Sequence, residues 1–167
     1  MRILFDSSYF FPLIKVKVEE SSPEIFSLIH QIKSLEMQFS SITLFELSAK
    51  GARMIKSGKL TSNDVIDGIN ALISWRNISS IDSWNGEVQR LAFDFRLDHS
   101  DYIDCLILTS AIIHANVFVS EDITLQKLLK TKWLNRIREI NIEFEILNTD
   151  QLKAKINEVE VNSEIVK

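Results

Sequence analysis

Cysteine, glycine and proline are all scarce in this chain of 167 residues. The single cysteine, Cys105, excludes an internal disulfide, and it stands in an apolar run where packing in the core is the expected role. With four glycines, the sequence contains neither a GxGxxG nor a P-loop signature, which argues against a nucleotide cofactor. The two prolines lie in no Pro- or Gly-rich stretch, so no linker divides the chain, and its length suits one domain.

Long apolar runs are also missing, and none approaches the ~20 residues that a membrane-spanning helix needs. At the N-terminus, Arg2 is followed by Asp6 within the first apolar run, which is not typical of a signal peptide. The hydrophobic fraction of 46% is still enough for a large core, and the mean hydropathy is close to zero. We therefore expect a globular protein without a membrane span, and the single cysteine suits a cytoplasmic location.

The chain has no excess of positive charge: 19 Lys and Arg residues face 23 Asp and Glu residues, so the net charge is −4. Proteins that coat nucleic acids are usually basic, and this balance argues weakly against that class. It does not exclude a nuclease, because acids gathered in an active site lower the net charge while basic residues still line the groove around it.

Strand-like and helical stretches alternate along the chain. Strands are expected at 2–5, 37–40, 78–81, 117–119 and 140–147. Helices are expected between them, including 41–59, 61–73, 84–95, 100–114 and 123–138, and a short helix follows 148–150 before a tail without pattern from about 158. This alternation predicts an α/β protein with a mostly parallel sheet and helices on both of its faces.

Serines are expected to cap three of these helices, because their hydroxyls accept hydrogen bonds from free backbone N–H groups. Ser7 or Ser8 follows the first strand, Ser41 precedes helix 41–59, and Ser100 precedes helix 100–114.

Three aspartates stand where strands end or where a buried helix begins. Asp6 follows the first strand, Asp122 closes the turn after the fourth, and Asp104 lies near the start of the apolar helix 100–114. Because ligands bind outside the carboxyl ends of parallel strands, we expect these carboxylates to meet at one edge of the sheet. Carboxylates gathered there raise one another's pKa, and a divalent cation removes that penalty.

Ligation by carboxylates, without a set of Cys and His residues, favours Mg²⁺ or Mn²⁺ over zinc. Such an ion completes its octahedron with waters and phosphate oxygens. It lowers the pKa of an attacking water and neutralises the charge that develops on the phosphate. The acids therefore predict metal-assisted hydrolysis of phosphodiester bonds.

Two further acids are open to more than one interpretation. Glu46 lies at the edge of the apolar face of its helix, and taken alone it is more typical of a partnered surface charge than of a ligand. Asp101 shares a helix face with Asp104 and is either a fifth acid of the site or merely the first-turn acid of the helix. We rank it behind the other acids, as a residue that could support the site.

Four motifs, taken in order, resemble those of the PIN-domain nucleases. They are Ile3-Leu4-Phe5-Asp6-Ser7-Ser8, Ser41-Ile42-Thr43-Leu44-Phe45-Glu46-Leu47, Asp104-Cys105-Leu106-Ile107-Leu108-Thr109-Ser110-Ala111 and Val119-Ser120-Glu121-Asp122. Each is short, but the ordered set covers the chain from residue 3 to about 147. The resemblance implies a PIN-like three-layer α/β/α sandwich and a Mg²⁺- or Mn²⁺-dependent endoribonuclease acting on single-stranded or structured RNA. Many small members are toxins of VapBC-type toxin–antitoxin pairs, silenced by an antitoxin protein and often homodimeric.

The same resemblance assigns metal binding and catalysis to Asp6, Glu46, Asp104 and Asp122, with Ser8 as a helper. It also implies that residues 1–150 form the nuclease domain and that 151–167 add a C-terminal helix and tail to the same domain.

Basic residues that could bind RNA phosphates are Arg53, Lys56, Lys127 and Lys130. A solvated helix face is the commoner explanation for any one of them. The three histidines are scattered; only His99 lies near the expected site, and the sequence gives it no role.

Three other classes of protein share some of these features. A haloacid-dehalogenase-type phosphatase also begins with a strand and an Asp, but it needs a second Asp where Ser8 stands. A receiver domain needs an acidic pair after the first strand and a lysine after a late strand, and neither is clear here. A non-catalytic PIN-like module that only binds RNA or a protein stays open, although the presence of all four acids argues against it.

Overall fold

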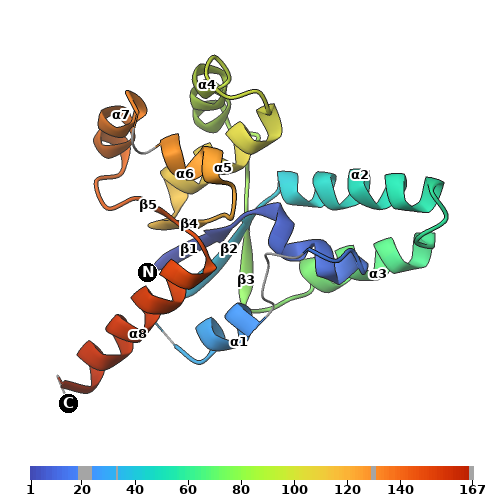
Figure 1. Cartoon of the computed structure of the whole chain (residues 1–167), viewed down its shortest axis with the longest axis horizontal. Helices are drawn as coiled ribbons and strands as arrows, with labels where there is room; N and C mark the ends of the chain where they lie inside the picture. Colours follow the sequence, from blue (N-terminus) through green and yellow to red (C-terminus); the bar gives the residue numbers. More distant parts are fainter. Residues whose placement is uncertain (19–23, 33, 129–130, 166–167) are drawn as a thin grey trace.

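The computed structural model is built on one all-parallel sheet of five strands, in the order β3-β2-β1-β4-β5 (Figure 1). The structure describes residues 1–18, 24–32, 34–128 and 131–165. The strands are β1 (Arg2–Phe5), β2 (Glu36–Ser40), β3 (Ile78–Ile81), β4 (Val117–Val119) and β5 (Glu145–Leu147). From β1 the chain first builds outward to β2 and β3 and then returns to place β4 on the other side of β1. This reversal makes the carboxyl ends of β1 and β4 the expected place for a ligand.

Helices cover both faces of the sheet and make three layers (Figure 1). One outer layer contains α4 (Gly86–Phe95), α5 (Tyr102–His114), α6 (Ile123–Leu128) and α7 (Trp133–Ile140). The other contains the 3-10 helix η1 (Ser7–Ile14) with α1 (Glu24–His30), α2 (Ile42–Lys56), α3 (Ser62–Ile73) and α8 (Thr149–Ile165). Side chains of β1 alternate between the layers, since Leu4 belongs to the first core and Ile3 and Phe5 to the second.

Helix α5 is the most deeply buried helix of the first layer. Eight consecutive residues, from Cys105 to Ile112, are buried, as its apolar sequence predicted. Its buried Thr and Ser hydroxyls bond back to the helix itself, Thr109 Oγ1 to the Cys105 carbonyl at 2.8 Å and Ser110 Oγ to the Leu106 carbonyl at 2.7 Å. Cys105 is core, as expected.

Helices α2 and α3 form an arm that projects from the sheet (Figure 1). Two glycines allow the close packing of this arm. A Cβ at Gly51 would overlap the Val65 side chain, and a Cβ at Gly68 would overlap the Leu13 carbonyl of η1. Lys15, which follows η1 directly, also pairs with Asp64 of α3. The arm is thus fixed against η1, and its inner end carries Glu46.

The region after β4 differs from the predicted single helix 123–138. The structure has two helices, α6 and α7, and the chain turns at Thr131 and Lys132. The Thr131 carbonyl and hydroxyl both serve as acceptors at the start of α7, from Leu134 N at 3.2 Å and Trp133 N at 3.3 Å. Trp133 then packs on Phe95, with the ring centroids 4.4 Å apart. This contact fixes the start of α7 against α4, so α7 does not continue α6.

The predicted strand 140–147 is also too long, because α7 extends to Ile140 and β5 covers only Glu145–Leu147. Ile142, assigned to the strand by its alternation, is 80% exposed. Asn141 instead ends α7, and its side-chain amide donates to the Ile112 and Ala115 carbonyls. After β5, α8 continues to Ile165, so the tail expected from about 158 is helical over this stretch.

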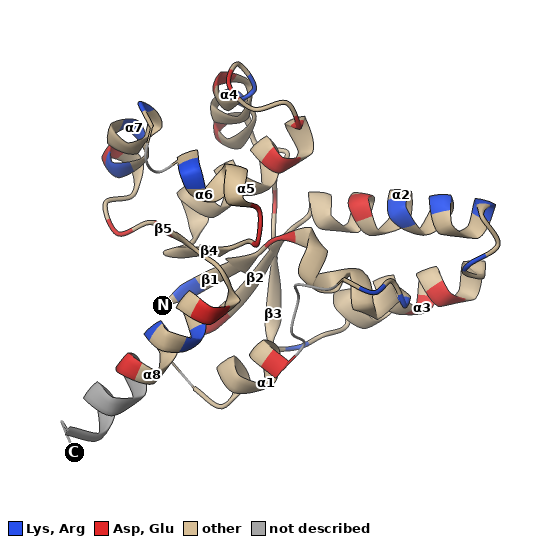
Figure 2. Ribbon diagram, in the orientation of Figure 1, with Lys and Arg blue, Asp and Glu red and all other residues tan. Residues whose placement is uncertain are grey.

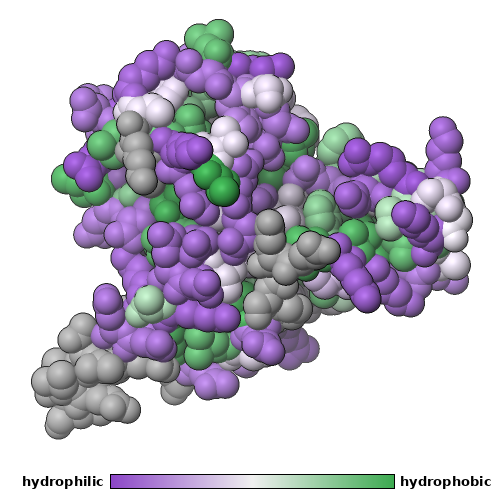
Figure 3. Space-filling model, in the orientation of Figure 1, coloured by the Kyte–Doolittle hydropathy of each residue, from purple (hydrophilic) through white to green (hydrophobic). Residues whose placement is uncertain are grey.

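The surface is mostly hydrophilic on the face shown in Figure 3, with small and separate apolar patches. None of the described helices is both long and apolar enough to cross a membrane.

Candidate active site

All four predicted acids lie toward the carboxyl edge of the sheet. Asp6 follows β1, Asp122 follows β4, Asp104 is in the first turn of α5, and Glu46 is near the start of α2. Figure 2 shows acidic segments around the ends of β1 and β4 and on the inner half of α2. Their charges act on one another, as the pKa shifts described below indicate.

Asp6 caps η1 with its own carboxylate, so the expected cap by Ser7 or Ser8 is wrong. Asp6 Oδ1 accepts from Ser7 N at 2.7 Å. Its Oδ2 accepts from Ser120 Oγ at 3.0 Å and, more weakly, from Ser8 Oγ at 3.4 Å. Burial, followed by the charge of Asp104, raises the pKa of Asp6 to about 6 even though these hydrogen bonds oppose the shift.

Glu46 points into the site and is only partly exposed, which the surface-charge interpretation did not expect. Its carboxylate accepts a hydrogen bond from Ser7 Oγ. Burial, and then the charges of Asp6, Asp104 and Asp101, raise the pKa of Glu46 to about 7. Glu46 is therefore close enough to the aspartates to share their charge repulsion.

The start of α2 is fixed without the predicted side-chain cap. Ser41 makes no capping hydrogen bond. Its hydroxyl instead accepts from Ser83 N at 3.1 Å, and its own N–H donates to the Ile81 carbonyl at 2.8 Å. These bonds tie the beginning of α2 to the end of β3 and so orient the turn that carries Glu46.

Asp101, rather than Ser100, is the N-cap of α5. Its Oδ1 accepts from Ile103 N at 2.8 Å and from Asp104 N at 3.4 Å. The exposed Asp101 carboxylate nevertheless acts on the site, because its charge contributes to the raised pKa values of Glu46 and Asp104. It serves as a helix cap next to the acids.

Asp104 has a partner that the sequence did not identify. The His99 Nε2 atom lies 3.1 Å from Asp104 Oδ2, and His99 is buried. Burial raises the pKa of Asp104, as do the charges of Asp101 and Asp122, while the contact with His99 opposes the shift. The only sequence signal for His99 was its position five residues before Asp104.

Ser120 is a second residue that the sequence did not single out. This buried hydroxyl donates to Asp6 Oδ2 and accepts from Asp122 N at 3.1 Å, so it joins the turns that carry the two aspartates. Asp122 Oδ1 in turn accepts from Thr124 N at 2.6 Å. A small hydroxyl residue directly after a buried strand was the available signal.

The donors have the chemistry of a site for a hard cation, namely carboxylates that repel one another in partly buried surroundings. In the part of the chain that the structure describes, however, no group of three or more His, Cys, Asp or Glu side chains is arranged to hold a metal ion. Asp6, Glu46 and Asp104 are engaged by Ser120, Ser7 and His99 respectively. The residue types therefore fit Mg²⁺ or Mn²⁺, whereas their side-chain arrangement is that of a hydrogen-bonded acid cluster.

Comparison with known proteins gives a likeness in fold. No family model matches the sequence, and no curated protein matches it. A solved structure, VapBC2 from Rickettsia felis bound to a DNA fragment from their promoter, includes a chain with the same fold. It aligns with a TM-score of 0.54 and 15% identity over 89% of this chain and 98% of that chain. The fold is PIN-like. The predicted three-layer α/β/α sandwich with a parallel sheet is thus confirmed.

Three of the basic residues predicted to bind RNA lie on two helices, α2 and α6, of the described part of this PIN-like fold. Arg53 and Lys56 are exposed on α2, and Figure 2 shows basic segments along this helix toward the outer end of the arm. Arg53 is seven residues, or about two turns, from Glu46 and shares its face. Lys127 is exposed on α6. Lys130 lies outside the described residues.

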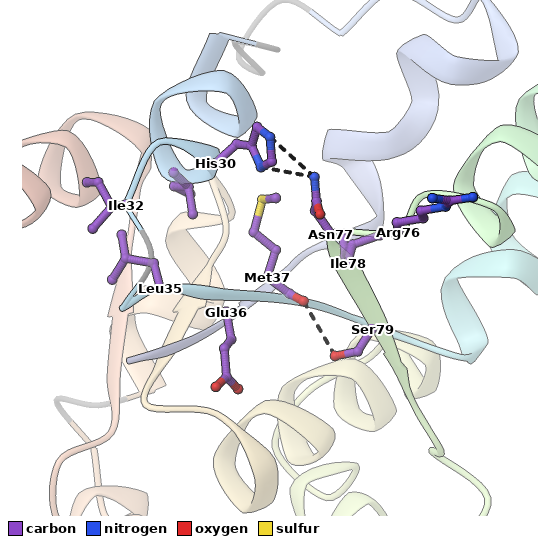
Figure 4. Close-up of a pocket in the computed structure, with 10 residues that line it drawn as sticks. His30, Ile32, Leu35, Glu36, Met37, Arg76, Asn77, Ile78 and Ser79 are labelled. Atoms are coloured by element: carbon purple, nitrogen blue, oxygen red, sulfur yellow. Dashed lines mark hydrogen bonds between the residues drawn. The ribbon is translucent and has the colours of Figure 1, made fainter.

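A cavity of about 460 Å³ lies at the other end of the sheet, where β2 and β3 begin (Figure 4). His30 points to Asn77 across it, with His30 Nδ1 2.9 Å from Asn77 Nδ2, whereas Arg76 points away. The cavity contains none of the four acids. It is therefore separate from the candidate active site.

Proposed function

We propose that this chain is a metal-dependent endoribonuclease, a hydrolase of RNA phosphodiester bonds. The observation that carries the proposal is the set of four carboxylates at the carboxyl edge of the sheet, two of which have pKa values raised to about 6 and about 7. Partly buried acids that repel one another are unfavourable unless function requires them. Their position beside the reversal in strand order is where α/β proteins bind ligands.

Asp6, Glu46, Asp104 and Asp122 would hold Mg²⁺ or Mn²⁺. Such an ion, when bound, lowers the pKa of the attacking water and neutralises charge on the phosphate. Ser7 orients Glu46. Ser120 bonds both to the Asp6 carboxylate and to the Asp122 N–H, and so sets the distance between the segments that carry these two acids.

His99 orients Asp104 through its Nε2 atom. Ser8, at 3.4 Å from Asp6 Oδ2, is a weaker support for the same carboxylate as Ser120. Asp101 holds the first turn of α5 and so fixes the backbone of Asp104.

The RNA substrate would be bound by basic side chains around these acids, namely Arg53, Lys56, Lys127 and Lys130. Phosphates attract Lys and Arg in a way that does not depend on sequence. Cations near the acids are needed in a chain of net charge −4, because the acids alone repel a polyanion.

We further propose that the chain acts in the cytoplasm as the toxin of a VapBC-type pair, with an antitoxin protein as partner and a homodimer as its assembly. The fold that it shares with a chain of VapBC2 supports this role. Large apolar side chains on the α2–α3 arm also support a protein partner, since Phe45, Ile66 and Ile73 are 61%, 54% and 61% exposed.

Cleavage of a labelled RNA panel tests the proposal, with Mn²⁺, with Mg²⁺ and with EDTA. The wild type is compared with Asp104→Asn and with Asp67→Asn, which changes an exposed acid of α3 as a matched control. We expect metal-dependent cleavage that Asp104→Asn abolishes and Asp67→Asn leaves intact. Cleavage that survives both EDTA and Asp104→Asn would contradict the proposed site.

The alternative function is a non-catalytic PIN-like module that binds RNA or a protein. The hydrogen-bonded state of the acids favours it, since no described group of three is arranged for a metal. For such a module, acid-to-amide substitutions would leave RNA binding equal or stronger, and binding would not need a metal. Folded wild-type protein that binds RNA without cutting it, with or without Mn²⁺, would support this alternative.

A further inference from the structure

One side-chain oxygen joins three segments of the chain next to the candidate active site. Glu121 Oε1 accepts hydrogen bonds from Tyr9 Oη at 2.7 Å, from Thr149 Oγ1 at 2.6 Å and from Thr149 N at 2.9 Å. Tyr9 belongs to η1, Glu121 to the turn after β4, and Thr149 is the first residue of α8. The carboxylate thus caps α8 from another part of the chain.

The donors of this junction are buried, so their bonds to Glu121 cannot be replaced easily by water. Tyr9 is 2% exposed and Thr149 6% exposed. The Tyr9 ring also meets Phe5 edge-on, with centroids 5.4 Å apart. Tyr9 Oη and Thr149 Oγ1 lie 2.7 Å apart, so without the carboxylate only one of the two hydroxyls could donate to the other. The remaining hydroxyl hydrogen would be buried without an acceptor, which is unfavourable.

Glu121 is placed so that this junction acts on two of the four acids. Its neighbour Ser120 donates to Asp6, and its other neighbour is Asp122. Tyr9 is three residues after Asp6 in the same segment. Two separate links therefore join the segment of Asp6 to the turn of Asp122, one through Ser120 and one through Glu121.

We propose that Glu121 is a positioning residue of the acidic site. It holds the turn that carries Asp122 against the segment of Asp6 and fastens both to the start of α8, so that the carboxylates keep their spacing toward a divalent cation. This inference rests on the proposed function. It makes α8, which contributes none of the four acids, part of the support of the site.

A purely structural contact would stabilise the fold without affecting the affinity for a metal ion. The chain offers a matched control for that case. Lys155 of α8 pairs with Glu145, which is opposite Val117 where β4 begins, at the far end of these strands from the acids. Both links attach α8 to the sheet, but only the Glu121 link reaches the acid-bearing turns.

The test compares wild type with Glu121→Ala, Tyr9→Phe and Lys155→Ala. Mn²⁺ is titrated into each protein without RNA and the melting temperature is followed, and Mn²⁺-dependent RNA cleavage is measured separately. Mutation of a residue that supports a metal ligand typically weakens metal affinity by roughly 10- to 100-fold. We expect the Mn²⁺ midpoint to rise by that factor for Glu121→Ala, to rise less for Tyr9→Phe, and to stay unchanged for Lys155→Ala even where its melting temperature falls.

A second measurement keeps the test independent of the metal. Amide hydrogen exchange of the metal-free proteins should be faster at Asp122 and Thr124 in Glu121→Ala and unchanged there in Lys155→Ala. A folded Glu121→Ala protein with the wild-type Mn²⁺ midpoint would overturn the inference. A wild type that responds to Mn²⁺ in neither assay would instead overturn the proposed function, and the positioning role with it.

Discussion

The Ser7 hydroxyl donates a hydrogen bond to the Glu46 carboxylate, across 39 positions of the sequence. The same serine donates its backbone N–H to Asp6 at 2.7 Å. One residue at the turn after β1 thus contacts two of the four acids, Asp6 through its backbone N–H and Glu46 through its hydroxyl. The contact stabilises Glu46 in its charged form, since a donor to a carboxylate favours ionisation.

Ser7→Ala should therefore raise the pKa of Glu46 above its already elevated value of about 7. The expected rise is on the order of 1 pH unit, because the donor to the charged form is lost. Carboxyl-detected NMR titration of metal-free protein measures it. Ser8→Ala is the matched control: its hydroxyl contacts Asp6 at 3.4 Å, so the Glu46 titration should stay the same. An unchanged Glu46 pKa in Ser7→Ala would show that this hydrogen bond does not stabilise the charged form of Glu46.

Glu46 should make the metal-free protein less stable as the pH rises. Its pKa is about 7 in the fold against an ordinary value of 4.5, so the folded state binds the proton more tightly. Stability is therefore lost between about pH 4.5 and pH 7 and is constant above that range. Glu46→Gln removes this titration and should raise the melting temperature at pH 8 in EDTA by roughly 3–8 °C.

Thermal melts at pH 4 and pH 8 check this expectation. At pH 4 the difference between Glu46→Gln and wild type should nearly vanish, because Glu46 is then protonated in both states. Adding Mn²⁺ at pH 8 should stabilise the wild type more than the variant. Glu46→Gln melting below wild type at pH 8 would mean that Glu46 is not under charge repulsion.

His99→Ala should weaken the site by freeing the Asp104 carboxylate. The variant loses the 3.1 Å contact between His99 Nε2 and Asp104 Oδ2. We expect the rate of RNA cleavage to fall by roughly 10- to 100-fold, as for other groups that orient metal ligands. The Mn²⁺ concentration needed for half-maximal activity should rise. His99→Asn, which keeps a side-chain donor, should recover part of the activity. His30→Ala, at the other end of the sheet, is the control and should cleave RNA like wild type.

Removing the two cations of the arm should weaken RNA binding without a change in chemistry. Arg53 and Lys56 are exposed on α2, so their double replacement by Ala is expected to cost little stability. Binding to RNA in EDTA should weaken, and the slope of log affinity against log salt should fall by about 1–2. Arg138→Ala changes an exposed cation of α7 and serves as the control. Equal salt slopes for the wild type and the double variant would show that Arg53 and Lys56 do not contact RNA phosphates.

Gly68→Ala should destabilise the fold, because the new methyl group would overlap the Leu13 carbonyl, a backbone atom that cannot move aside alone. We expect a loss of about 1–3 kcal/mol in the free energy of unfolding, the range typical of overpacking. Gly86→Ala is the matched substitution, since nothing lies within 4 Å of its Cβ position. It should be neutral or slightly stabilising, as Ala favours a helix more than Gly does. Urea denaturation of both variants measures the difference.

Local sequence determined the repeating elements and the position of the aspartates along them. The runs at Arg2–Phe5 and Val117–Val119 each form a buried strand with an acid in the turn that follows. Such strands are predictable because the signal, a short apolar run ended by polar turn residues, is contained within a few neighbouring residues. The same local logic failed where one pattern suits two structures. Alternation at 142–146 is typical of a strand, but α7 ends at Asn141 and the strand begins later. The basic stretch 123–138 is typical of one helix, but packing of Trp133 starts a second helix there.

The partners that hold the acids at the carboxyl edge follow from contacts between segments that are far apart in the sequence. Glu46 is partly buried beside Ser7 because α2 packs against η1, and no helical periodicity could predict a contact between those segments. The links of His99 to Asp104, of Ser120 to Asp6 and of Glu121 to Thr149 likewise depend on which strands become neighbours. The local sequence placed acids after strands and in the first turns of helices. How they are held follows from the order of the sheet, because β2, β1, β4 and β5 are consecutive parallel neighbours and the turns at their carboxyl ends therefore lie side by side.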